Sequence, residues 1–261
     1  MKTLLIIDPQ KDFCEGGALP VTGATEDCKR LAGFVEGILP DTILVTLDSH
    51  RYIDIAHPAF WKNDKAENPK PFETIISVED VENGVWKTTH PDRQEQALKY
   101  VKALAEGGRY PLCIWPPHCI IGHAGQNIQD TLGLALMEWE LKTLGIVHCI
   151  AKGTNPMTEH YSAYKAEVVD PYDSTTFPNK NLLYTVKSAD VTYIGGEALD
   201  YCVANTVRDI VNDPEFGEEN IKKLVLLEDC TSPVGFPKGL DKQFLDEMTS
   251  RGMKVCKSTE I

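Results

Sequence analysis

Cys202 is the residue whose surroundings best suit chemistry. It lies in residues 195–208 (GGEALDYCVANTVR), between a predicted strand at 190–194 and a predicted helix at 203–211. The first turn of a helix carries free N–H groups and the positive end of the helix dipole, which favour a thiolate and can stabilise an oxyanion. The position therefore suits a nucleophile, although a small buried core residue is the commoner role for a single cysteine.

Acidic residues follow other predicted strands. Asp8 ends the apolar run 3–7 (TLLII), and Asp48 ends the run 42–47 (TILVTL). Ligands gather at the carboxyl ends of parallel strands, so both lie where catalytic groups are found, although Asp8 before a proline is equally compatible with a turn. Asp48 and His50, two residues apart, can share a metal ion, whereas a solvated turn is the more frequent explanation of an isolated Asp-x-His.

Two further candidates come from a loop and a strand end. The segment 113–127 (CIWPPHCIIGHAGQN) contains paired prolines that forbid a regular helix. A loop presenting His118 to a pocket is favoured over a Cys/His zinc knuckle, because His118 and Cys119 are adjacent rather than in separated pairs. Lys152 ends a predicted strand at 145–151, where a lysine is usually a solvated charge unless another part of the site requires it.

Alternating strands and helices must position these residues. We predict an α/β fold, a three-layer α/β/α arrangement with about six mostly parallel strands and helices on both faces. The expected strands are 3–7, 42–47, 145–151, 190–194, 223–227 and 253–256, and the expected helices are 24–38, 92–104, 129–144, 203–211 and 240–251. We expect the apolar helix at 129–144 to pack on the sheet. Residues 51–84 are expected to form an irregular lid or binding loop, and residues 154–190 to be rich in loops.

The composition is that of an ordinary globular protein. The 261 residues include 42% hydrophobic and 25% charged residues, and the net charge is −13. This charge argues against nucleic acid and anionic membrane as partners. No apolar run approaches the roughly 20 residues of a membrane span, and the first is too short for a signal peptide, so we expect a cytoplasmic location. The eight scattered cysteines, without a CxxC pair, are expected to be free thiols.

Five ordered motifs resemble the nicotinamidase branch of the isochorismatase-like cysteine hydrolases, and the resemblance runs over nearly the whole chain. They are DPQKDF at 8–13, LDSH followed by RYIDIAHP at 47–58, WPPHC at 115–119, AKGTNPMTEHYSAY at 151–164 and GEALDYCV at 196–203. The resemblance implies one isochorismatase-like domain over residues 1–261, with loop insertions around 51–112 and 154–189.

The resemblance also assigns roles to individual residues. It implies a catalytic triad, a metal site, a cis peptide before the nucleophile with two oxyanion-binding amides, and an aromatic pocket. The triad is Asp8, Lys152 and Cys202; the metal ligands are Asp48, His50 and His118; the cis peptide joins Glu197 to Ala198, with the amides of Ala198 and Cys202 as oxyanion donors; and the pocket residues are Phe13, Trp115, Tyr161 and Tyr201. His57 and His123 are possible further polar contacts of the site, although solvated loop positions are the expectation for both.

The implied reaction is hydrolysis of nicotinamide to nicotinate and ammonia through a cysteine thioester, within NAD salvage. A divalent metal ion, zinc with iron or manganese as alternatives, would orient the substrate rather than attack it. A related amidase acting on another small amide or ureido compound is the second reading, and a non-catalytic module that binds a small ligand is the third. The partner is a small amide in the first two readings, and the sequence leaves open whether the chain forms a homo-oligomer.

Overall fold

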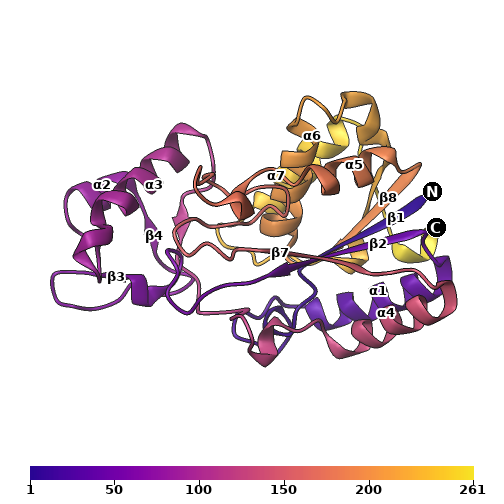
Figure 1. The fold of residues 1–261 in the computed structure, drawn as a ribbon, viewed down its shortest axis with the longest axis horizontal. Helices are drawn as coiled ribbons and strands as arrows, with labels where there is room; N and C mark the ends of the chain where they lie inside the picture. The colour runs from indigo at the N-terminus through magenta and orange to yellow at the C-terminus, as the bar shows by residue number, and fades with distance from the viewer.

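The computed structural model describes residues 1–261, and its centre is a six-stranded sheet in which all neighbouring strands are parallel (Figure 1). The spatial order of the strands is β10-β9-β8-β1-β2-β7. The strands are β1 (Lys2–Ile7), β2 (Thr42–Asp48), β7 (His148–Lys152), β8 (Val191–Gly196), β9 (Leu224–Leu227) and β10 (Lys254–Cys256). The predicted fold class is confirmed, and each strand lies within three residues of its expected position.

Strand register brings the ends of the central strands together. β1 is buried from Thr3 to Ile7, as expected of a strand covered on both faces. It pairs with β2 on one side and with β8 on the other, where Ile7 is level with Gly196. β2 pairs with β7 so that Asp48 is level with Lys152. The residues after β1, β2, β7 and β8 therefore lie at one edge of the sheet.

Helices cover both faces of the sheet (Figure 1). In that view α1 and α4 lie below the sheet, and α5, α6 and α7 lie above it. The helices are α1 (Ala24–Ile38), α4 (Asp130–Thr143), α5 (Lys180–Ser188), α6 (Ala204–Asn212) and α7 (Leu240–Ser250). Four of them match the predicted helices closely, but α4 packs mainly against α1 rather than lying flat on the sheet.

Helix α5 corrects the expectation of a loop-rich segment at 154–190. It begins after Asn179, whose side chain accepts a hydrogen bond from the backbone N–H of Leu182 and so caps the helix. Leu182, Leu183 and Val186 are buried on its inner face. The helix has only nine residues, and its few apolar positions are a weak periodic signal until the sheet is present to bury them.

Residues 58–113 form a small ordered lobe, so the expected irregular loop at 51–84 is wrong, whereas the predicted helix at 92–104 is confirmed. In Figure 1 this lobe lies beyond the carboxyl ends of the strands. It contains two short antiparallel pairs and two helices: β3 (Trp61–Lys62) with β5 (Lys87–Thr88), β4 (Ile75–Ile76) with β6 (Leu112–Cys113), α2 (Val78–Glu82) and α3 (Gln94–Glu106). Strands of two residues carry too little alternation to be recognised from sequence.

Short helical turns complete the structure. One π-helical turn, Leu199–Val203, precedes α6. The 3₁₀ turns are Lys11–Phe13, Pro58–Phe60, Pro91–Arg93, Ala124–Gln126, Ser174–Thr176, Glu218–Lys223, Glu228–Cys230 and Ser258–Glu260. None of the helices combines the length and the apolar character needed to cross a membrane.

The central strand gives a test of the core. Leu5 is fully buried in β1, so we expect Leu5→Ala to lower the free energy of unfolding by about 2 to 5 kcal/mol, through lost burial and the cavity left behind. Val85→Ala, at a position 49% exposed in the lobe, should change it by less than about 0.5 kcal/mol. Urea denaturation of both variants measures the difference, and equal effects would contradict the place of β1 in the core.

Candidate active site

A narrow pocket opens at the carboxyl end of the sheet, beside Cys202. It has about 30 Å³ of free volume, which suits a small substrate rather than a polymer. Most of the lining residues are apolar. The lining consists of Phe13, Leu19, Asp48, Trp115, His118, Glu159, Tyr161, Ala198, Tyr201, Cys202 and Val234. All four aromatic residues expected in the pocket are among them.

Asp8 and Lys152 meet Cys202, which lines this pocket, and each of the three comes from a different element. Lys152, the last residue of β7, places its Nζ 2.8 Å from Asp8 Oδ2 and 3.5 Å from Cys202 Sγ. Thr46 in β2 donates its hydroxyl to Asp8 Oδ1 at 2.5 Å and so fixes the carboxylate. All three side chains are almost completely buried. The chain thus brings a carboxylate, an ammonium group and a thiol into direct contact.

Burial decides the protonation of the thiol. It raises the pKa of Cys202 well above the ordinary value; Lys152 opposes this effect, while Asp8 and Asp48 add to it. Burial also raises the pKa of Asp8, although Lys152 opposes the shift. The thiol is therefore protonated at neutral pH, contrary to the expectation that its position at a helix start would make it a resting thiolate. A neighbouring base is needed to remove the proton, and Asp8 lies in the same cluster.

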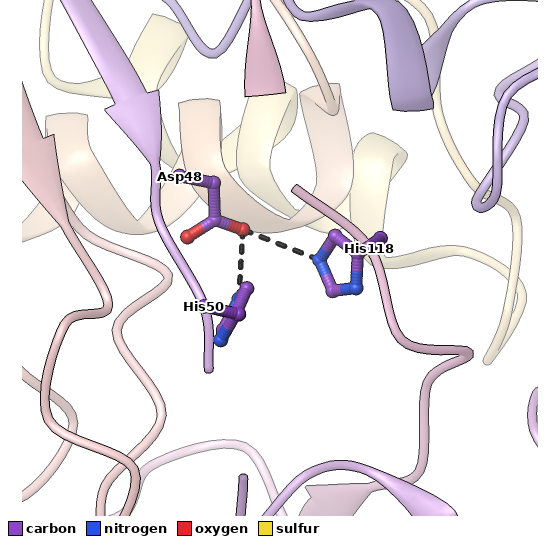
Figure 2. A group of neighbouring side chains, drawn as sticks. All are labelled: Asp48, His50 and His118. Atoms are coloured by element: carbon purple, nitrogen blue, oxygen red, sulfur yellow. Dashed lines mark hydrogen bonds and ion pairs between the residues drawn. The ribbon is translucent and has the colours of Figure 1, made fainter. Parts of the chain in front are cut away.

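A second cluster, formed by Asp48, His50 and His118, lies next to the triad (Figure 2). One ligand atom from each residue lies within 4.8 Å of the others, and all three residues are buried. The Nε2 atoms of His50 and His118 lie 3.0 and 3.3 Å from Asp48 Oδ2. Two imidazole nitrogens and a carboxylate oxygen form a donor set that zinc and similar divalent ions use.

The far sides of both imidazoles are held by the protein. His50 Nδ1 lies 3.0 Å from Asp54 Oδ2, and His118 Nδ1 lies 2.9 Å from the carbonyl oxygen of Pro116. Because each Nδ1–H can donate to an oxygen, each Nε2 is left to face the cluster. Burial lowers the pKa of His50, but Asp48 and Asp54 more than offset it, and the pKa lies well above its ordinary value. The carboxylates thus favour positive charge here, and the residues fit a metal cation.

Lys152 links the two clusters. Its Nζ lies 3.1 Å from Asp48 Oδ1 and donates to the carbonyl oxygen of His160 at 2.9 Å. Asp48 therefore contacts both Lys152 and the two histidines. Gly153 follows with φ +79°, and a Cβ there would lie 2.9 Å from Asp48 Oδ1, so a side chain at this position would crowd the junction. From the sequence, the triad and the metal residues were interpreted as two separate groups. In the structure they form one polar network.

Two histidines expected to be solvated differ in the structure. His123 is exposed, as expected, but the expectation is wrong for His57, which is fully buried. The His57 ring lies 5.2 Å from the ring of His50 and 5.6 Å from that of His118. Burial lowers the pKa of His57 to about 4, so its ring is neutral. His57 lies directly before the small lobe, and its side chain is buried although the surrounding segment is polar in sequence.

Glu159 and Asp54 are site residues that sequence reasoning did not single out. Glu159 lines the pocket, lies 4.0 Å from His50 Nε2, and has one carboxylate oxygen buried without a hydrogen-bond partner. Burial raises the pKa of Glu159 to about 7. Both residues lie inside motifs that resemble the family: Asp54 is four residues after His50, and Glu159 is seven residues after Lys152. Their spacing alone did not reveal which way the two side chains face.

The turn before Cys202 has the expected cis peptide between Glu197 and Ala198. Gly196 precedes it with φ +109°, and a Cβ there would lie 2.0 Å from the carbonyl oxygen of Ile7, so only glycine fits. The backbone N–H of Ala198 donates no hydrogen bond within the protein, and Ala198 lines the pocket beside Cys202. Asp200 accepts the N–H groups of Val234 and Gly235 and ties this turn to the loop before α7.

Comparisons with known proteins agree with this geometry. No family model matches the chain. The nicotinamidase of Acinetobacter baylyi is 27% identical over 206 residues, covering 79% of this chain and 72% of that protein. The nicotinamidase of Saccharomyces cerevisiae is 25% identical over 260 residues, covering 98% and 99% of the two chains. In sequence, this chain is similar to these two nicotinamidases.

Solved structures of nicotinamidases share the fold. An Acinetobacter baumanii nicotinamidase matches with a TM-score of 0.66 at 21% identity, over 99% of this chain and 97% of that one. A Pyrococcus horikoshii pyrazinamidase in complex with zinc matches with a TM-score of 0.54 at 19% identity, over 98% of both chains. The resemblance to nicotinamidases inferred from the five motifs is thereby confirmed.

The aromatic wall of this nicotinamidase-like pocket is rigid. The Trp115 ring lies 5.0 Å from the Tyr201 ring in an edge-to-face arrangement, and its Nε1 donates to the Tyr161 hydroxyl at 3.0 Å. The Tyr161 and Tyr201 rings lie 4.9 Å apart, and the Tyr201 hydroxyl donates to the carbonyl oxygen of Phe236. Phe13 stands beside His118, with 5.5 Å between the ring centres. These contacts hold flat apolar surfaces next to the polar network.

Removing the lysine of this network should destabilise the fold. In Lys152→Met two buried carboxylates, Asp8 and Asp48, lose their shared ammonium partner. We therefore expect the free energy of unfolding at pH 8 to fall by about 3 to 5 kcal/mol. The loss should shrink at pH 5, because without the lysine the pKa values of the buried carboxyls rise above those of the unfolded chain, and protonation removes the buried charge.

Urea denaturation at both pH values measures this effect. Lys142→Met, which removes an exposed lysine from α4, serves as the matched control and should change stability little. A loss in Lys152→Met that is the same at pH 5 and pH 8 would contradict the origin of the effect in buried carboxylates.

Proposed function

We propose that this chain is a cysteine-dependent amidohydrolase that converts nicotinamide and water to nicotinate and ammonia, a reaction of NAD salvage. The observation that carries the proposal is the contact of Lys152 with both Asp8 and Cys202, 2.8 and 3.5 Å away, beside a small aromatic pocket. The sequence similarity to two nicotinamidases, over 79% and 98% of the chain, supports hydrolysis of an amide C–N bond.

Acylation begins when Cys202 attacks the carboxamide carbon. Asp8 takes the thiol proton as the C–S bond forms, since burial raises the pKa of both groups and Lys152 contacts both of them. The carbonyl oxygen becomes an oxyanion, and the amides of Ala198 and Cys202 are the donors that would stabilise it. The C–N bond then breaks, Asp8 returns the proton to the leaving nitrogen, and ammonia departs from a thioester.

Deacylation uses the same carboxylate. Asp8 takes a proton from a water molecule as the water oxygen attacks the thioester carbon. The same two amides would stabilise the second oxyanion. The C–S bond breaks, and Asp8 returns the proton to the Cys202 sulfur. Nicotinic acid leaves as nicotinate after losing its proton to solvent, and the thiol is ready for another cycle. Lys152 stays protonated throughout, because Asp8 and Asp48 hold its pKa well above the ordinary value despite burial.

Asp48, His50 and His118 would hold a divalent metal ion, and we propose zinc. Their donor set, the held Nδ1 atoms of both imidazoles and the surrounding carboxylates fit such a cation. The zinc complex of the Pyrococcus horikoshii pyrazinamidase supports this choice of metal. When bound, the ion supplies a Lewis acid that can orient a pyridine nitrogen. The three residues lie beside the triad, so a ring anchored at this cluster places its carboxamide next to Cys202.

Cys202 gives the direct test of the mechanism. We expect Cys202→Ala to lower the rate of ammonia release from nicotinamide at least about 1000-fold, because no other thiol lies in the pocket. Cys256→Ala, which changes a partly exposed cysteine in β10, should retain the wild-type rate. Ammonia release is measured on a panel of nicotinamide, pyrazinamide and carbamoylated amines.

The panel separates the alternatives. Release that survives Cys202→Ala would refute the thioester mechanism. Release from a carbamoylated amine but not from nicotinamide would assign the chain to an amidase with another substrate. No release from any compound, with ligand binding retained, would indicate a binding module.

Asp54 tests the metal site without relying on activity. Asp54→Asn weakens the hydrogen bond that holds His50, so we expect the affinity for zinc to fall about 10-fold or more. Competition with a zinc-binding dye measures the affinity, and Asp64→Asn, at an exposed position in the lobe, is the control. A wild-type chain that neither contains nor binds a divalent metal would refute the site, as would equal affinities in the two variants.

A further inference from the structure

We propose that Val234 limits the size of the substituents that a substrate ring can carry, and that Asp200 is the positioning residue that holds Val234 in place. Val234 lies in residues 232–236, which we call the wall segment, and it lines the active-site pocket. This inference rests on the proposed function and extends it, since it concerns which pyridine carboxamides reach Cys202. Neither Val234 nor Asp200 belongs to the triad or to the cluster of metal ligands.

The wall segment has no regular secondary structure of its own. It follows the 3₁₀ turn Glu228–Cys230, precedes α7, and contains no helix or strand. Val234 and Phe236 pack against the core, whereas the residues on either side of Val234 are exposed. Because such a segment forms no hydrogen-bonded ladder, its position depends on the groups that bind its backbone from outside.

Asp200 fixes the middle of the wall segment with both of its carboxylate oxygens. Oδ1 accepts the backbone N–H of Val234 at 2.9 Å, and Oδ2 accepts that of Gly235 at 2.8 Å. Asp200 is almost completely buried, so water does not compete for these hydrogen bonds. It lies in the π-helical turn Leu199–Val203, two residues before Cys202. One short turn therefore carries the proposed nucleophile and holds Val234.

Two further hydrogen bonds join the ends of the wall segment to the same turn. The carbonyl oxygen of Ser232 accepts the backbone N–H of Leu199 at 2.9 Å, and that of Phe236 accepts the hydroxyl of Tyr201 at 2.5 Å. Ser232 also donates its hydroxyl to Asp27 Oδ2 in α1 at 2.6 Å. These bonds do not involve the carboxylate in the middle, so we expect its loss to loosen the middle of the segment without releasing the ends.

Val234 differs from the other apolar residues that line the pocket. The Tyr201 ring packs against the rings of both Trp115 and Tyr161. Leu19, the other aliphatic lining residue larger than alanine, is almost completely buried, whereas Val234 is only partly buried. Val234 is therefore the lining side chain whose size can change with the least disturbance of the core.

The small volume of the pocket gives the size of Val234 its effect. The free volume is about 30 Å³, so a methyl group added to a substrate ring competes for space with a lining side chain. Val234 and Cys202 line the same small pocket, so a ring whose carboxamide lies at the sulfur also contacts Val234. One extra methylene group in an apolar pocket changes kcat/KM about 10- to 200-fold. The wall segment is thus a part of the pocket that selects substrates by size.

Val234 gives the direct test. Ammonia release from nicotinamide and from its ring-methylated derivatives gives a selectivity ratio, kcat/KM of the methylated compound divided by that of nicotinamide. We expect Val234→Ala to raise this ratio about 10-fold or more for at least one methylated compound, because two methyl groups leave the pocket wall. Val234→Leu should lower the ratio. Val255→Ala, at a partly buried position in β10 outside the pocket, is the matched control and should keep the wild-type ratio.

Asp200→Asn tests the positioning role. Its amide NH₂ cannot accept a hydrogen bond, so one of the two backbone N–H groups loses its acceptor. We expect the selectivity ratio to rise as in Val234→Ala. The double variant should show less than the product of the two single effects, because both changes act on the same wall. Asp229→Asn is the matched control, since Asp229 also accepts two hydrogen bonds, from the backbone N–H and the hydroxyl of Ser258.

The outcomes separate this inference from the proposed function. A merely structural role of Asp200 would lower the rates for all substrates alike and leave the ratio unchanged, which overturns the positioning role. Wild-type hydrolysis of nicotinamide, with the same ratio in Val234→Ala, Val234→Leu and the wild type, overturns the inference and leaves the proposed function intact. A wild-type chain that does not hydrolyse nicotinamide overturns both. Thermal unfolding followed by circular dichroism verifies that each variant is folded.

Discussion

The ionic cluster around Lys152 is the constraint on which the rest of the site depends. An ammonium group buried at the end of β7 is tolerable only because Asp8 and Asp48 lie 2.8 and 3.1 Å away, and the two carboxylates are tolerable only because of the ammonium. Cys202 contacts the lysine of this cluster, and the two histidines contact Asp48. The proposed nucleophile and the proposed metal site are therefore held by one set of charges, so neither can move without disturbing the other.

Strand order explains how residues distant in the sequence reach this cluster. Parallel pairing of β7, β2, β1 and β8 aligns four carboxyl ends, and each delivers one part of the site: Lys152, Asp48, Asp8 and the turn before Cys202. The loop after β6 and the loop after β7 then complete the site, adding Trp115, His118, Glu159 and Tyr161 to the pocket wall. The sheet positions the reactive groups, and the insertions decide what reaches them.

Burial changes the chemistry that the residue types alone suggest. A thiol at a helix start tends toward the thiolate, yet the surroundings of Cys202 are dry and hold two carboxylates, so its pKa rises. The same dry environment raises the pKa of Asp8, which makes this carboxylate a better proton acceptor. The proposed mechanism therefore relies on transfer of one proton between thiol and carboxylate rather than on a permanently charged sulfur. Burial disfavours the charged forms of both groups, so the proton is expected to stay on one of the two rather than leave to solvent.

The sequence by itself determined which predicted strands end in polar residues and that a mostly parallel sheet carries them. Apolar runs ending in Asp8, Asp48 and Lys152 have a strong local signal, because a strand buried on both faces seldom contains charged residues and tends to end where one appears. The motifs around them were enough to indicate nicotinamidases. Only the tertiary structure decided that His57 is buried, that Glu159 faces the pocket, that α5 exists, and that Asp48 belongs to both clusters. These features depend on which distant segments cover a residue, and no local pattern of residues records that.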